Sequence, residues 1–123
     1  MKAGKVHVVP LSEQAMAALQ RAKDMQPDGT DLIFPGASLR RPLSDMTLLK
    51  ILRDMNVNAT VHGMRSTFRD WVADATNFAP EVAEAALAHA VKSKVEAAYK
   101  RTDFLEKRRK LMEAWGDYCS GSK

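Results

Sequence analysis

The stretch VHGMRSTFRDWV, residues 61–72, decides the fold and predicts a helix that begins at Thr60 or Val61. Within such a helix His62 and Arg65 are three positions apart, so both side chains lie on one face. The planar guanidinium of Arg65 offers a fork of donors that matches two phosphate oxygens. The imidazole of His62 can add a hydrogen bond or move a proton. This face is therefore suited to hold a phosphate group.

A second stretch, LAHAVKSKVEAAYKR at residues 87–101, adds His89 and, ten positions later, Tyr99. His89 can hydrogen-bond the same phosphate, and the hydroxyl of Tyr99 becomes a covalent nucleophile once it is activated. Two imidazoles, a guanidinium and a phenol in this order can hold and attack a phosphodiester without a metal ion. A lone histidine is more often structural, as we expect for His7, but the combined pattern reverses that expectation for His62.

At these residues the chain resembles the tyrosine recombinases, the phage-integrase family, and within that family the prophage integrase branch. The phrases that carry the resemblance are HGxRxTFRDW, present here as HGMRSTFRDW, and LAH…KVEAAYxR, present here as LAHAVKSKVEAAYKR. The resemblance covers essentially all of the 123 residues. It implies a mainly α fold with a small N-terminal β element. It also implies that residues 1–123 form the C-terminal portion of a catalytic domain.

The resemblance implies a set of catalytic residues, which are Tyr99, Arg65, His62, His89 and Lys2. The lysine is assigned because MKAGKVHVVPLS has the family's shape of a β-turn before a strand that ends in Val-Pro-Leu, and Lys5 is the competing candidate. The family places a further arginine on a helix upstream, and this chain has no candidate for it. We therefore expect the domain to lack its N-terminal portion, and this chain alone to be inactive.

The implied reaction is transesterification at a DNA phosphorus, in which Tyr99 forms a 3′-phosphotyrosyl link and releases a 5′-hydroxyl. Arg65 stabilises the equatorial oxygens, His62 helps to accept the tyrosine proton, and His89 hydrogen-bonds a phosphate oxygen. The lysine protonates the leaving oxygen, and rejoining needs no ATP. The implied role is integration or excision of a prophage or mobile element. The resemblance implies neither a metal nor another cofactor.

The implied partners are double-stranded DNA attachment sites, a homotetramer assembled on DNA, and a DNA-bending accessory protein as a further candidate. The implied location is the bacterial cytoplasm, on the nucleoid. A net charge of +4, from 19 Lys+Arg against 15 Asp+Glu, weakly favours a nucleic-acid partner. The residues expected to contact DNA are Lys92, Lys94, Lys100 and Arg101.

Composition excludes several other classes. The hydrophobic fraction of 46% and the charged fraction of 28% are those of an ordinary globular domain. No apolar run is long enough to span a membrane, and the N-terminus has no signal-peptide pattern. The single cysteine, Cys119, cannot form an intrachain disulfide.

Capping residues and periodicity predict the remaining elements. The segment 5–10 is β-branched and predicts the second strand of a hairpin. Helices are predicted at 13–24 after Ser12, after Ser44, from Pro80 to near His89, over 95–100 around Tyr99, and after Asp103. The last helix has the apolar stripe Phe104, Leu105, Arg108 by its stem, Leu111, Met112 and Trp115. Gly116 and the tail Ser120-Gly121-Ser122-Lys123 are expected to end it.

Several interpretations remain open from the sequence. The stripe of the last helix fits packing on its own domain or on a neighbouring protomer. Trp71 and Trp115 are interpreted as core or interface anchors, and Tyr118 as a packing or surface residue. Arg69 fits either a DNA phosphate contact or a surface salt bridge.

The alternative functions are a helical DNA-binding module without catalysis and a type IB topoisomerase relative that relaxes DNA. The flanks HGMRSTFRDW and KVEAAYKR favour the integrase branch over the topoisomerase. For the enzyme we expect His62, Arg65 and His89 to converge on one basic concave surface.

Overall fold

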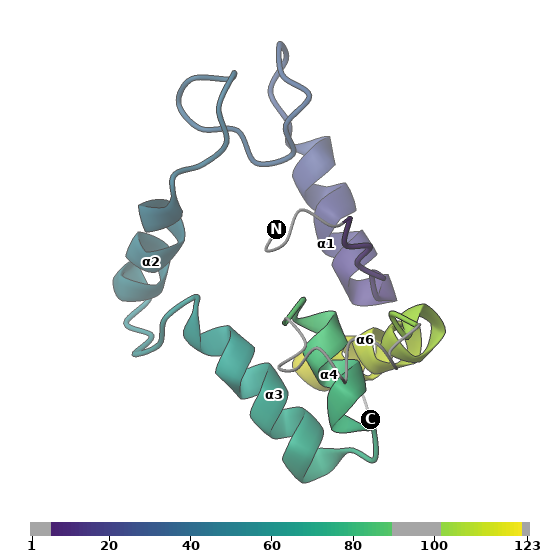
Figure 1. Ribbon diagram of the computed structural model, residues 1–123. Coiled ribbons are helices and arrows are strands. Elements are labelled where there is room, and N and C mark those ends of the chain that lie inside the picture. Colours follow the sequence, from purple (N-terminus) through teal and green to yellow (C-terminus); the bar gives the residue numbers. More distant parts are fainter. Residues whose placement is uncertain (1–5, 90–101, 122–123) are drawn as a thin grey trace. The chain divides into compact units, whose positions relative to one another are not determined.

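The computed structural model describes residues 6–89 and 102–121, and the regular elements in this part of the chain are helices. They are α1 (Glu13–Asp24), α2 (Asp45–Asp54), α3 (Gly63–Ala75), α4 (Pro80–Ala86) and α6 (Leu105–Cys119), shown in Figure 1. The predicted mainly α fold is therefore confirmed. The chain divides into two compact units, one of residues 1–14 with 67–123 and one of residues 15–66. None of the described helices has the length and apolar character to cross a membrane.

The β element predicted near the N-terminus is not seen, because residues 6–10 form no strand. The isolated antiparallel bridge among the described residues joins Pro35 and Pro42, in the other unit. The backbone carbonyl of Val8 instead accepts a hydrogen bond of 2.6 Å from Nη1 of Arg108, a side chain of α6. Branched side chains favour extended backbone, but a strand needs a neighbouring strand to complete its hydrogen-bond ladder. Here a helix side chain takes the place of that neighbour.

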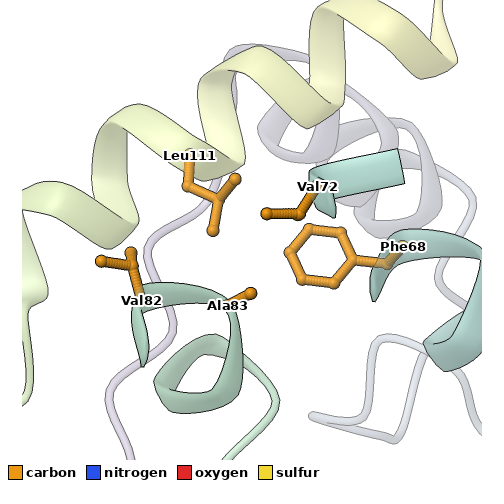
Figure 2. Packing of buried hydrophobic residues seen from close by; sticks show 5 residues of the cluster. All are labelled: Phe68, Val72, Val82, Ala83 and Leu111. Atoms are coloured by element: carbon orange, nitrogen blue, oxygen red, sulfur yellow. The ribbon is translucent and has the colours of Figure 1, made fainter. Parts of the chain in front are cut away.

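Three helices build the core of the first unit (Figure 2). Its buried members are Phe68 and Val72 of α3, Val82 and Ala83 of α4, and Leu111 of α6, each no more than 5% exposed. Figure 2 shows these side chains pointing toward one another from the three helices. The stripe of the last helix thus packs on its own chain, which decides between the two packings that the sequence left open.

An aromatic cluster extends this core. The ring centroids of Trp71 and Trp115 are 5.0 Å apart, and Phe68 meets Trp115 edge-on at 5.2 Å. Tyr118 stacks on Trp115 at 5.6 Å and remains 57% exposed. Offset and edge-on ring pairs of this kind add roughly 0.5–1.5 kcal/mol each beyond the area that they bury. The two tryptophans are therefore core anchors, and Tyr118 is a packing residue as predicted.

The start of α6 is fixed by Asp103 and Arg108. The Asp103 carboxylate accepts the backbone N–H of Leu105 at 3.1 Å, but the N-cap of α6 is Phe104, which has a left-handed backbone and no side-chain cap. The prediction that Asp103 caps the last helix is therefore wrong by one residue. Arg108 is 1% exposed, and its Nε donates to the carbonyl of Asp103 at 2.8 Å. With the bond to Val8, this side chain ties the N-terminal segment to α6. A buried guanidinium is tolerated because its donors meet acceptors.

The prediction that Gly116 ends the last helix is wrong, because α6 continues to Cys119. The helix ends instead at Ser120, the first residue of the tail that the sequence also predicted. Gly116 is buried where α6 meets the segment before α1. A Cβ at this position would lie 2.7 Å from Oγ and 2.8 Å from Cβ of Ser12. Beside it, Nε2 of Gln14 donates to the carboxylate of Asp117 at 2.7 Å. The glycine therefore permits a close approach between two segments that are far apart in the sequence.

The second unit is built around helices without buried residues, since neither α1 nor α2 contains one. The predicted helix at 13–24 is confirmed, and Ser44 precedes α2 as predicted. The Ser44 hydroxyl, however, meets the hydroxyl of Thr47 at 3.0 Å and makes no hydrogen bond to the helix backbone. The helices of this unit thus receive little of their stability from a core.

Candidate active site

His62 lies in the turn that leads into α3, since the helix begins at Gly63. This corrects the prediction that His62 is already helical. The Thr60 hydroxyl accepts the N–H of Gly63 at 2.9 Å, and the carbonyl of His62 accepts the N–H of Arg65 at 3.1 Å. Residues three apart in such a tight turn lie on the same side of the backbone. The turn therefore keeps the relation between His62 and Arg65 that the sequence predicted, and both residues are exposed.

His89 is placed by the way α4 ends. Pro80 occupies the start of this helix, as predicted, and the helix ends at Ala86. Ala88 then adopts a left-handed backbone with φ of 57°, its N–H donates to the carbonyl of Ala85 at 3.1 Å, and the N–H of His89 donates to the carbonyl of Glu84 at 3.0 Å. This pair of bonds is the Schellman arrangement, which satisfies the last carbonyls of a helix. His89 is consequently folded back toward the last turn of α4.

The carboxylate of Glu84 links His89 to α3. Its Oε2 lies 2.5 Å from Nδ1 of His89, and its Oε1 accepts a hydrogen bond of 2.7 Å from Nε of Arg69. All three side chains are partly exposed, between 30% and 42%. The hydrogen bond from Arg69 lowers the pKa of the Glu84 carboxyl, the contact with His89 lowers it further, and partial burial opposes the shift. Glu84 is therefore a fixed anion beside the imidazole.

Sequence reasoning identified His89 but missed Glu84. The open interpretation of Arg69 is decided in favour of an ion pair, because its guanidinium is bonded to Glu84. The sequence does contain a signal for Glu84, because this residue lies five positions before His89 and the helix that contains it ends before His89. To use this signal, one would have to predict that Ala88 is left-handed and so brings His89 back beside Glu84. Alanine seldom adopts that conformation.

Part of the predicted site lies outside the described residues. This part consists of Tyr99 with the predicted helix 95–100, Lys2 and its competitor Lys5, and the DNA-contact candidates Lys92, Lys94, Lys100 and Arg101. Arg65 and His62 belong to the second unit and His89 to the first. Their convergence on one basic concave surface stays a prediction.

Comparison with known proteins finds clear relatives. The chain is 37% identical over 120 residues to the prophage integrase IntA of Escherichia coli (strain K12), which is 95% of this chain and 29% of IntA. It is 34% identical over 119 residues to the prophage integrase IntZ of the same organism, again 95% of this chain and 29% of the relative. The integrase of Enterobacteria phage P4 is 33% identical over 124 residues, covering 96% of this chain and 28% of the phage protein. No family model and no solved structure matches the chain.

These relatives are phage and prophage integrases, and the chain is similar to them over nearly its whole length. The chain spans less than a third of the length of these relatives. The resemblance read from HGMRSTFRDW and LAHAVKSKVEAAYKR is thereby confirmed at the level of the family.

Proposed function

We propose that this chain is the C-terminal portion of the catalytic domain of a site-specific DNA recombinase. The enzyme cleaves and rejoins DNA through a 3′-phosphotyrosyl intermediate and thereby integrates or excises a prophage or mobile element. The observation that carries the proposal is the match to prophage integrases over 95% of the chain, together with His62, Arg65, His89 and Tyr99 in the family's order.

The proposed chemistry assigns one task to each side chain. Arg65 holds two oxygens of the scissile phosphate and neutralises charge that builds up in the transition state. Tyr99 attacks the phosphorus, and the phenol proton passes toward His62. The bond from phosphorus to the leaving 5′-oxygen breaks, and Lys2 supplies the proton which that oxygen takes up. In its imidazolium form His89 donates a hydrogen bond to a phosphate oxygen through Nε2, because its Nδ1 is occupied by Glu84.

The position of Arg65 in α3 is consistent with its proposed role in binding the phosphate. Arg65 and Arg69 are one helical turn apart in this helix, and such residues lie on one face. Arg69 is in turn bonded to the carboxylate that contacts His89. The same helix therefore carries Arg65 and the arginine that holds the carboxylate beside His89.

The substrate we propose is a double-stranded attachment site, bound by four copies of the complete protein and a DNA-bending accessory protein. Lys92, Lys94, Lys100 and Arg101 are proposed to contact its backbone phosphates. Contacts of this kind release counterions, so the affinity for DNA should fall steeply as the salt concentration rises.

The test is trapping of a covalent adduct. The complete recombinase that carries this segment is incubated with a nicked suicide substrate, from which the cleaved strand diffuses away. Tyr99→Phe should abolish the adduct and leave DNA binding nearly unchanged, since only the attacking oxygen is removed. Tyr118→Phe is the matched control and should still form the adduct. An adduct that survives Tyr99→Phe, or that is lost with Tyr118→Phe alone, would overturn the assignment.

A further inference from the structure

The contact that the proposed function leaves unexplained is the carboxylate between Arg69 and His89. The three side chains come from α3, from α4 and from the turn that follows α4, and all belong to the first unit. Glu84 holds His89 twice, because its backbone carbonyl accepts the N–H of His89 and its carboxylate meets the imidazole. The backbone bond belongs to the end of α4 and brings the imidazole near Glu84, and Arg69 bonds the same carboxylate, so the contact is part of an arrangement of three side chains.

We propose that Glu84 is a positioning residue, which fixes the ring orientation and the tautomer of His89 so that Nε2 is left to meet the substrate phosphate. The assignment of that phosphate to DNA rests on the proposed function. The effect of Glu84 on the imidazole is a property of this chain and can be measured without DNA.

The tautomer follows from what each group can donate. An ionised carboxylate has no proton to give, so Nδ1 of His89 must be the donor in the contact of 2.5 Å. In the neutral ring Nε2 is then an acceptor, and in the imidazolium it carries the second N–H. That N–H can bond a phosphate oxygen, while the carboxylate on the other side of the ring balances the positive charge. The arrangement follows the logic of an acid that orients a histidine in a catalytic triad.

Arg69 makes the carboxylate a reliable orienting group. It occupies Oε1 and leaves Oε2 for the imidazole, so the rotation of the carboxyl group is fixed. Its positive charge also keeps Glu84 ionised, as the lowered pKa of this carboxyl indicates. The imidazole is 42% exposed and would rotate freely without such a partner.

The first test reads the tautomer directly. Long-range ¹H–¹⁵N spectra of the 123-residue chain, recorded at about pH 8.5 where ordinary imidazoles are neutral, assign the protonated nitrogen of each histidine. We expect His89 to be protonated at Nδ1. Glu84→Ala should return His89 to the tautomer mixture of an unconstrained imidazole, and His7 and His62 should not change.

Glu81→Ala is the matched control, because Glu81 lies in the first turn of the same helix and is exposed. It should leave the His89 signals in place, and circular dichroism should show equal helix content in both variants. Protonation of His89 at Nε2 in the unsubstituted chain, or an unchanged tautomer in Glu84→Ala, would overturn the proposal.

The second test asks whether the positioning matters to the reaction. In the complete recombinase, Glu84→Ala should slow adduct formation by roughly 10–100-fold without changing the affinity for DNA. Glu84→Gln should restore part of the rate, since an amide oxygen can still accept the Nδ1–H. In a His89→Ala background, Glu84→Ala should cause no further loss in the rate of adduct formation. A purely structural role of Glu84 would instead lower this rate in both backgrounds.

Equal losses in both backgrounds would overturn the link between Glu84 and His89 in catalysis. If no variant or parent protein forms an adduct, the proposed recombinase function fails, and the tautomer spectra alone then decide the role of Glu84.

Discussion

At the scale of single residues, the left-handed positions explain how His89 is presented. Three non-glycine residues in the described chain have positive φ, namely Asn56, Ala88 and Phe104. Asparagine adopts this conformation readily, whereas alanine does so at a cost. Ala88 accepts that cost because the Schellman arrangement needs a left-handed residue at its position. The strain at Ala88 is thus tied to the return of His89 toward Glu84.

Relief of this strain should be measurable. Ala88→Gly should raise the free energy of unfolding by about 0.5–1 kcal/mol, since glycine adopts φ of 57° without a Cβ penalty and that gain exceeds its extra entropy in the unfolded chain. Urea unfolding of the two proteins measures the difference. Ala85→Gly, inside α4, is the control and should destabilise by about 1 kcal/mol. Equal destabilisation by both changes would contradict the role assigned to position 88.

The carboxyl of Glu84 should make stability depend on pH. Its pKa is lowered in the folded chain, chiefly by Arg69, so the ionised form is the one that the fold stabilises. The ionised carboxylate therefore contributes fully to the free energy of unfolding above the unfolded pKa of about 4.5. This contribution is lost as the pH falls through the lower pKa of the folded chain. Urea midpoints from pH 7 to pH 3 should fall more for the parent chain than for Glu84→Gln. Parallel curves for the two proteins would show that the ion pair contributes no stability.

At the scale of elements, the sequence predicted most helices because their signals are local. Pro80 marks a helix start because its fixed φ suits the first turn, and this prediction is confirmed. Asp103 lies one residue before the N-cap Phe104, so its position was predicted only approximately. Two other predictions were wrong because their outcome depends on distant partners. The strand predicted at residues 5–10 is absent over 6–10, where an arginine from α6 binds the backbone, and Gly116 lies inside a helix against Ser12. Neither partner can be found by reading neighbouring residues.

The packing at Gly116 can be tested by a double-mutant cycle. Gly116→Ala gains about 1 kcal/mol of helix propensity, but its Cβ would overlap Ser12, and overpacking of this kind costs about 1–3 kcal/mol. We expect a net loss of stability for this variant. Ser12→Gly combined with Gln14→Ala removes the side-chain atoms that the new Cβ would meet, so in that background Gly116→Ala should become neutral or stabilising. Additive effects in urea unfolding would show that position 116 is not in contact with these side chains.

At the scale of the whole molecule, the sequence predicts candidate reactive groups more readily than the residues that hold them in place. His62, Arg65 and His89 were predicted from spacing and resemblance, since reactive side chains of fixed type form a recognisable order. The supports, Glu84 and Arg69, lie on separate helices and come together only through the packing of the first unit. A supporting residue can be supplied by any neighbouring element, so its position in the sequence follows no general rule.

The distribution of burial predicts how the chain opens. Helices α1 and α2 have no buried residues, whereas α3, α4 and α6 share the core around Leu111. Amide hydrogen exchange should therefore be slowest near Val72 and Leu111, and at least about tenfold faster in α1 and α2. Leu111→Ala, which should cost about 2–5 kcal/mol, should accelerate exchange in α3, α4 and α6 and leave α2 nearly unchanged. Equal protection in α2 and α6 would contradict this division.

The bonds that tie the N-terminal segment to α6 have a consequence for biosynthesis. Val8 is bonded to Arg108, 100 positions later, and Gln14 to Asp117, 103 positions later. During translation about a hundred residues are added between one partner of each bond and the other, and contacts so distant in sequence form late. Segment 6–14 therefore leaves the ribosome well before α6 is made. During that interval it is accessible to chaperones and proteases, and the first unit cannot be completed before α6 has been synthesised.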